Sequence, residues 1–155
     1  MENIKYRLKE EIPVLKPLYL MDKFIKKIKG ENKLISNIVI VIAQDEEFVY
    51  FLNCSTNSEQ NIDNENYVYL KVFKEEIKDQ LPILMMVDLK KIYKMDIVDF
   101  QSKLDQENYN EDDSSELSFK SQVEIVNKMV NKLNEENKFP NMIFIKKNNN
   151  FQSTI

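Results

Sequence analysis

The residue types best suited to chemistry lie together in one polar run, Asn53-Cys54-Ser55-Thr56-Asn57-Ser58. The run follows a stretch rich in β-branched and aromatic residues and precedes a stretch rich in Asn, so a strand is expected to end within it. A strand end can present functional side chains, because the strand is rigid and the loop beyond it is open to solvent. The alternative is structural, since Ser, Thr and Asn side chains commonly bond to the backbone where a strand ends.

The composition excludes several classes of catalytic and metal site. The chain has no His, which removes the usual zinc ligand and every Ser-His or Cys-His catalytic pair. Cys54 is the only cysteine, so neither an internal disulfide nor a cysteine-based metal cluster can form. One glycine, Gly30, cannot supply a Rossmann fingerprint, a P-loop or an EF-hand loop. We expect no cofactor and no metal, and acid–base work would fall to Asp, Glu, Lys or Tyr.

Length and charge limit the remaining possibilities. A chain of 155 residues predicts one domain over residues 1–155, and a net charge of −4 disfavours a general nucleic-acid coat or a polybasic membrane binder. The acidic runs at residues 45–47 and 111–113 are expected in turns or linkers, where carboxylates ordinarily serve solubility. The N-terminal residues are charged throughout, and the longest apolar run, residues 38–43, is far shorter than the ~18–20 residues that span a bilayer. We therefore expect a cytoplasmic protein without membrane contact.

The sequence predicts that the elements that position the polar run are mainly strands. Residues 33–44 and 47–55 are β-branched or aromatic and are separated by a polar link, which predicts a central β-hairpin. Alternation places Ile38, Ile40 and Ile42 on one face of this hairpin and Val39 and Val41 on the other, and both faces should be covered.

Further strands are expected on either side of the hairpin. Residues 18–29 fit either a helix or a strand, and we favour a strand that ends at a turn near Gly30. Residues 67–73 and 82–89 have strand composition, and residues 90–94 could extend the second of them.

Helices are expected in the second half of the chain. Asp96 resembles an N-cap, followed by a short helix to Leu104, and residues 105–116 form an acidic linker. Beyond it, apolar residues recur every three or four positions and predict a long amphipathic helix over residues 117–138. The core-facing stripe of that helix would consist of Phe119, Val123, Val126, Val130 and Leu133. Residues 141–147 suggest a last strand, and residues 148–155 a frayed tail. This order predicts an α+β fold on a small antiparallel sheet or barrel.

One resemblance adds to this interpretation. The hairpin at residues 33–57, which ends in Cys54-Ser55-Thr56-Asn57, resembles the central hairpin of the MazF/PemK and ToxN/AbiQ toxins. The runs at residues 67–73 and 83–93, followed by the short helix, also resemble the later strands of those families, so the likeness covers residues 18–104. Those toxins are SH3-like barrel endoribonucleases, and the resemblance therefore implies an SH3-like barrel.

The resemblance also implies site residues. Thr56 would match the hydroxyl of the toxins' Thr/Ser motif, with Ser55 or Ser58 as its neighbour, and Lys71 or Lys33 would be the cation beside the phosphate. The chain differs from those families in two places. Ser36-Asn37 stands where many relatives have Arg-Pro, and Asn57-Ser58-Glu59 replaces the lysine that follows the motif in ToxN-type proteins.

Two classes of function follow. The first, which we favour, is a non-catalytic interaction or inhibitor protein of a phage or mobile element that binds a host macromolecule, most directly a protein. Its surface would be the acidic loops at residues 57–66 and 105–116 or the exposed side of helix 117–138. The alternative is a metal-independent endoribonuclease in which the RNA 2′-hydroxyl attacks its own phosphate, with Thr56, Ser55 and Lys71 as the catalytic residues.

Overall fold

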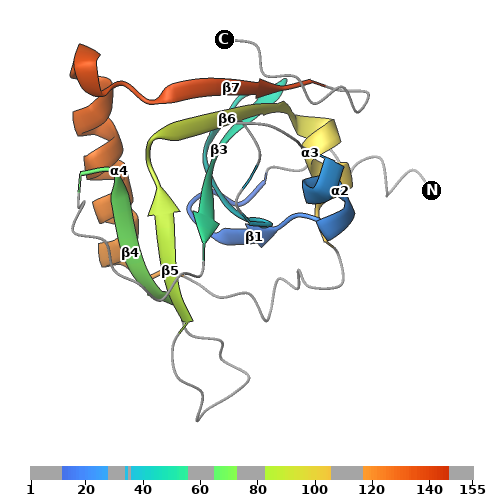
Figure 1. The fold of residues 1–155 in the computed structure, drawn as a ribbon, viewed down its shortest axis with the longest axis horizontal. Coiled ribbons are helices and arrows are strands. Elements are labelled where there is room, and N and C mark those ends of the chain that lie inside the picture. The colour runs from blue at the N-terminus through green and yellow to red at the C-terminus, as the bar shows by residue number, and fades with distance from the viewer. Residues whose placement is uncertain are drawn as a thin grey trace.

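The structure is a computed structural model, and it describes residues 12–27, 34, 36–55, 65–72, 83–105 and 117–146. Figure 1 shows strands gathered in one sheet, with helices at its edges. In chain order the elements are β1 (Pro17–Tyr19), α2 (Asp22–Lys27), β2 (Ile38–Gln44), β3 (Phe48–Ser55), β4 (Tyr67–Val72), β5 (Ile83–Asp88), β6 (Lys91–Asp96), α3 (Ile97–Lys103), α4 (Phe119–Leu133), the 3₁₀ turn η1 (Glu136–Lys138) and β7 (Asn141–Ile145). The predicted α+β class is confirmed.

The predicted central hairpin is formed by β2 and β3, which pair antiparallel with Ile40 opposite Leu52. The turn between them is held by Asp45, whose side chain accepts hydrogen bonds from the backbone N–H groups of Glu47 and Phe48 at 2.8 and 2.7 Å. These two bonds lower the pKa of the exposed Asp45 carboxyl. The acidic run at residues 45–47 therefore builds a turn.

Both faces of this hairpin are covered, as alternation predicts. Val39 and Val41 point into one hydrophobic core together with Phe51, Tyr93 and Phe100. The opposite face belongs to a second core, whose hairpin members are Ile38, Ile40, Leu52 and Cys54, with Ile42 and Tyr50 packed against it. The hairpin thus separates two cores, and other helices and strands must shield each of them from solvent.

Strand β3 shares its second edge between two strands. Its first half pairs with β6 and its last two residues, Cys54 and Ser55, pair with β5. The chain bends between β5 and β6, where the Asp88 carboxylate accepts the backbone N–H of Lys90 at 2.8 Å. Strand β4 lies outside β5, and β7 runs parallel to β6. The sheet is antiparallel apart from that last pair, because the chain returns through α4 before it enters β7.

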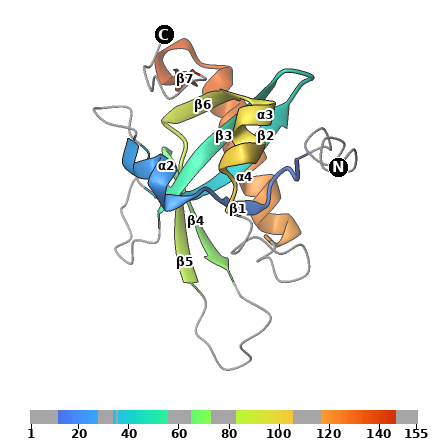
Figure 2. The same ribbon diagram turned by 90° about the vertical axis from the view of Figure 1, so that its right-hand side faces the viewer.

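The sheet does not close into a barrel within the described residues, so the barrel alternative is wrong. Helix α3 stands where the closing strand would be. Strand β1 pairs with β2 along one edge, and on its other side it meets the chain that follows α3, where the backbone N–H of Asp105 donates to the Tyr19 carbonyl and Leu20 bridges Leu104. A helix cannot continue the ladder of a strand, so the strands do not close into a ring where α3 lies close to β1 (Figure 2).

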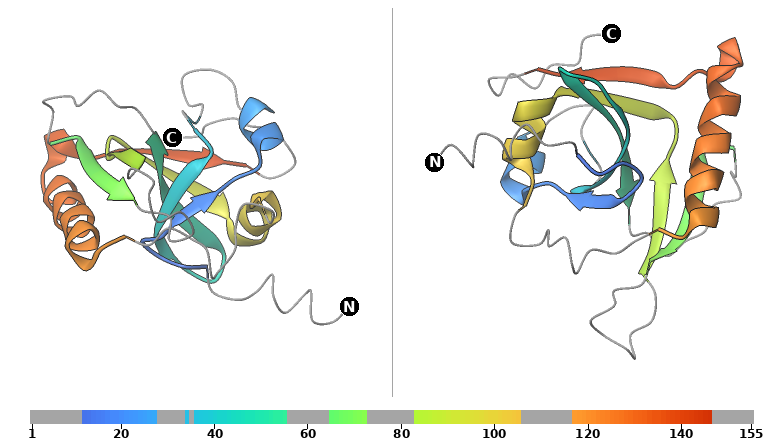
Figure 3. Two further views of the ribbon diagram at one scale, coloured as in Figure 1. Left: turned by 90° about the horizontal axis from the view of Figure 1, so that it is seen from below. Right: turned by 180° about the vertical axis from the view of Figure 1, so that it is seen from behind.

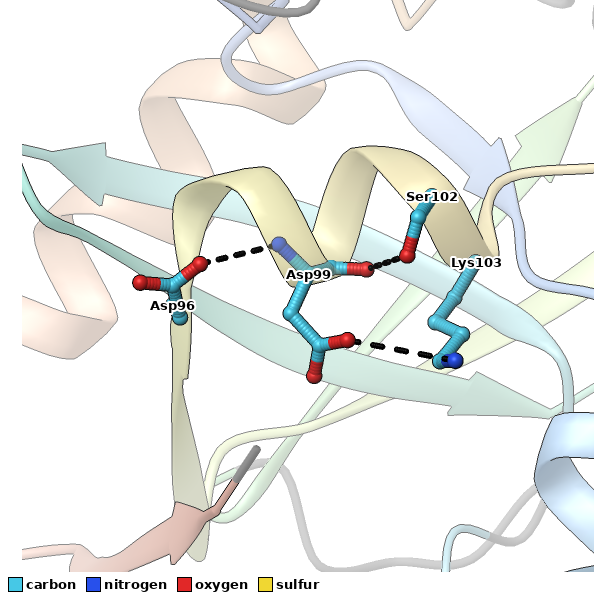
Figure 4. Close-up of polar contacts among 4 residues, drawn as sticks. All are labelled: Asp96, Asp99, Ser102 and Lys103. Atoms are coloured by element: carbon cyan, nitrogen blue, oxygen red, sulfur yellow. Dashed lines mark hydrogen bonds and ion pairs between the residues drawn. The ribbon is translucent and has the colours of Figure 1, made fainter. Parts of the chain in front are cut away.

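Helix α3 begins where the sequence places its cap. The Asp96 side chain accepts the backbone N–H of Asp99 at 2.9 Å, and Asp99 forms an ion pair with Lys103 at 3.8 Å (Figure 4). The Ser102 hydroxyl donates to the Asp99 carbonyl at 2.6 Å. Phe100 is buried on the face that meets the sheet, so the short helix is confirmed.

The N-terminal part differs from the prediction. Strand β1 covers only Pro17–Tyr19, and α2 replaces the favoured strand over the second half of residues 18–29. Phe24 is buried in the first core and the next residue, Ile25, packs against the same core, which a helical turn permits and a strand does not, because successive side chains of a strand point to opposite faces. Strand β7 occupies most of residues 141–147, whereas the linker beyond Asp105 and the tail at residues 148–155 lie outside the described residues.

The buried amide of Asn53 holds the start of β2 against the end of β3. Its Nδ2 donates to the carbonyls of Ser36 and Ile38, each at 2.9 Å. We expect Asn53→Ala to lower the free energy of unfolding by about 2 kcal/mol, because buried carbonyls lose their donor. Urea unfolding measures this loss. The same substitution at the exposed Asn141 should cost less than about 0.5 kcal/mol, and equal losses would contradict the role of Asn53.

Candidate functional site

The predicted hydroxyl site is only partly described. Ser55 is the last residue of β3 and pairs with Met86 of β5. Lys71 pairs with Leu84 on the other edge of β5, so a whole strand lies between β3 and the strand that carries Lys71. Thr56, Ser58 and Lys33, together with the side chain of Lys71, lie outside what the structure describes. The proposed catalytic set therefore stays a prediction of the sequence.

The members of the polar run that are described serve the core. Cys54 is buried, and burial, with a smaller contribution from Asp88, raises the pKa of its thiol far above the usual range. Its carbonyl accepts the Ser36 hydroxyl. The structural interpretation of the run thus holds for Asn53, which bonds to the backbone, and Cys54 is a core side chain without nucleophilic character.

The Ser55 hydroxyl is buried and has no hydrogen-bond partner among the described residues. We expect Ser55→Ala to leave the free energy of unfolding unchanged or to raise it by up to about 1 kcal/mol, because a methyl group removes the desolvation cost of an unpaired hydroxyl. Ser36→Ala is the matched control, since it deletes a bonded hydroxyl and should cost about 1 kcal/mol. Equal losses in thermal unfolding would contradict this assignment.

The described part of the chain offers neither a metal-binding cluster nor a membrane-spanning helix. It contains no cluster of three or more Cys, Asp or Glu side chains that could hold a metal ion. No helix in it is both long enough and apolar enough to cross a membrane.

Helix α4 is the element whose surroundings differ most from the prediction. It lies at one edge of the molecule beside β4 (Figures 1 and 3). Ile125 and Met129 are buried in the second core, where Leu117 joins them. The Ser118 side chain caps the helix by accepting the backbone N–H of Ser121 at 3.1 Å, and the helix ends at Leu133, five residues before the predicted end.

Lysines complete the docking of α4. Lys128 donates to the Tyr67 carbonyl at 3.2 Å, and the buried Lys132 donates to the Asn66 side chain. Lys138, just beyond the helix, forms ion pairs with Glu65 and Glu135. Three cations thus converge on the turn that begins β4. Polar contacts therefore take the place of part of an apolar interface between α4 and this turn.

The five side chains predicted to face the core are exposed instead. Phe119 is 80% exposed, and the other four are 39 to 47% exposed. We call this set the α4 stripe: Phe119, Val123, Val126, Val130 and Leu133. A spacing of three and four residues predicts which side chains share a face but not which face meets the sheet. The helix is turned so that Ile125, Met129 and Lys132 meet the sheet and the α4 stripe lies beside them.

The border of the α4 stripe carries little charge. On its outer side lie the exposed residues Lys120, Asn127 and Asn134, so one cation accompanies two uncharged amides. Phe139 and Met142, which follow the helix, are exposed as well. Exposed apolar side chains scattered singly are ordinary, whereas a row of five along one helix is not.

The face of β3, β6 and β7 that carries Lys94 is poorly suited to binding a nucleic acid. Lys94 lies over the rings of Phe48, Phe144 and Tyr50, at 4.2, 5.6 and 5.8 Å from their centroids. Its charge also lowers the pKa of the nearby Asp45 carboxyl. A nucleic acid would meet a carboxylate beside a lysine that already covers the aromatic rings, which is unfavourable for stacking and for phosphate binding.

Comparison with known proteins leaves the chain without a family. No family model matches it, and no curated protein is significantly similar to it. The resemblance to the MazF/PemK and ToxN/AbiQ toxins therefore stays a prediction.

Substitutions at two neighbouring residues, Ile125 and Val126, test which face of α4 packs against the sheet. In dilute protein we expect Ile125→Ala to lower the free energy of unfolding by about 3 kcal/mol, because it opens a cavity in the second core. Val126→Ala, one residue along on the exposed side, should change it by less than about 0.5 kcal/mol. Thermal unfolding followed by circular dichroism measures both. The reverse ranking would mean that the α4 stripe faces the sheet.

Proposed function

We propose that this chain is a non-catalytic interaction protein that binds another protein through the α4 stripe. The observation that carries the proposal is the exposure of five apolar side chains in a line along a docked helix. Burial of their apolar surface against a partner lowers the free energy by roughly 25 cal/mol per Å². An amphipathic helix that presents positions spaced by three and four residues is a recurrent mode of protein recognition.

The docking of α4 supports the proposal energetically. The Ser118 cap, the buried Ile125 and Met129 and the lysine contacts hold the helix before any partner arrives. A preformed helix loses little conformational entropy on binding, so more of the apolar contact energy appears as affinity.

The same observations favour a protein over a nucleic acid as the partner. The α4 stripe is apolar and is bordered mainly by asparagine, whereas phosphate binding needs clustered Lys or Arg. The ribonuclease alternative rests on Thr56 and Lys71, and the described residues add nothing to it.

A photo-crosslinking experiment tests the proposal. Benzoylphenylalanine in place of Val126 or Val130 should give one discrete crosslinked product in cells, identified by mass spectrometry as a single protein, because these side chains touch the partner. The same probe in place of Asn131, which is exposed on the polar side of α4, is the matched control and should give none. The purified chain should leave single-stranded RNA intact.

Two results would overturn this function. One is the absence of a discrete product from both stripe positions, and the other is an equal yield from the Asn131 control. Cleavage of RNA by the purified chain, lost on Thr56→Ala, would establish the ribonuclease instead.

A further inference from the structure

The α4 stripe has the spacing of a coiled-coil seam. Its members follow one another at intervals of four, three, four and three residues, which is a heptad repeat. Val123 and Val130 then occupy a positions, and Val126 and Leu133 occupy d positions. A seam of this kind packs against another helix of similar periodicity, and the chain itself supplies one.

The two ends of the α4 stripe are equidistant from its central residue. Phe119 and Leu133 each lie seven residues from Val126, and the two other valines lie on either side of it. If a second copy runs antiparallel, Val126 meets its counterpart on a two-fold axis. Phe119, the most exposed member, then meets Leu133 and Phe139 of the second copy. Such an interface is self-complementary, as a two-fold dimer requires.

The charges at the ends of α4 favour the same direction. The exposed Lys120 lies at the start of the helix, and the exposed Glu135 and Glu136 follow its end. An antiparallel second copy places Lys120 beside these carboxylates, whereas a parallel copy places like charges together. Antiparallel helices also oppose their dipoles favourably. At the centre the neighbouring Asn127 is uncharged, so no repulsion arises on the axis.

We propose that the occupant of the α4 stripe is a second copy of this chain, packed antiparallel about a two-fold axis at Val126. The inference rests on the proposed function, because it names the partner of the same surface. Each copy keeps its own sheet and both cores, and the two α4 helices form the contact.

The mass of the purified full chain in solution tests association. Light scattering over a dilution series should give twice the 18.5 kDa of the monomer at the concentrated end. Val126→Glu should raise the dissociation constant by roughly 100-fold or more, because two unpaired carboxylates would meet on the axis. Asn131→Glu adds the same charge on the polar side of α4 and should leave the mass unchanged. Circular dichroism of both variants verifies that each is folded.

Disulfide trapping tests the orientation. The V126C variant should crosslink to itself under mild oxidation, since its two thiols face each other on the axis. F119C and L133C should each remain uncrosslinked alone and should crosslink when mixed. The wild-type chain is the control, because its only thiol, Cys54, is buried and should form no bond.

The outcomes separate this inference from the proposed function. A monomeric mass throughout the dilution series, without crosslinking of V126C, overturns the second copy. The photo-crosslink from Val126 in cells would then identify a different protein and would leave the interaction function standing. Self-crosslinking of F119C overturns the antiparallel direction. Loss of both the dimer and the photo-crosslink overturns the two proposals together.

Discussion

Strand β3 is paired along both edges and covered on both faces, and the rest of the structure is arranged around this constraint. Phe51 stacks on Tyr93, its cross-strand neighbour in β6, with ring centroids 5.4 Å apart, and contacts Phe100 of α3 at 5.3 Å, so α3 covers one face. Leu52 and Cys54 on the other face need β4, β5 and α4. A backbone so enclosed must satisfy every polar group internally, which explains why a buried Asn53 bonds to two carbonyls.

Enclosure of β3 also decides what the polar run can do. The strand end carries Cys54 and Ser55 into the sheet, where a thiol stays protonated and a hydroxyl is shielded from solvent. Chemistry at a strand end needs side chains beyond the last paired residue. In this chain strand pairing continues through Ser55, so Cys54 and Ser55 both lie within the sheet.

Helix α4 covers the second core with a narrow face. Two buried apolar side chains, Ile125 and Met129, and two lysines make its contacts, since Lys128 and Lys132 bond to Tyr67 and Asn66. A wider apolar face would bury the neighbouring row of side chains too. With these contacts on the docked face of the helix, the α4 stripe stays in solvent.

The sequence by itself determined the α+β class, the central hairpin with its two covered faces, the Asp96 cap and the absence of histidine chemistry, because local periodicity, capping and composition act over short distances. It could not determine that α3 interrupts the ring of strands, that residues 22–27 turn into a helix, or which side of α4 is buried. Each of these depends on contacts between residues far apart in the chain. The Lys132 contact with Asn66 spans 66 positions, and no local pattern records it. Only the tertiary structure could decide that five apolar residues predicted to form core would face solvent, since helical spacing is the same on either side of the helix.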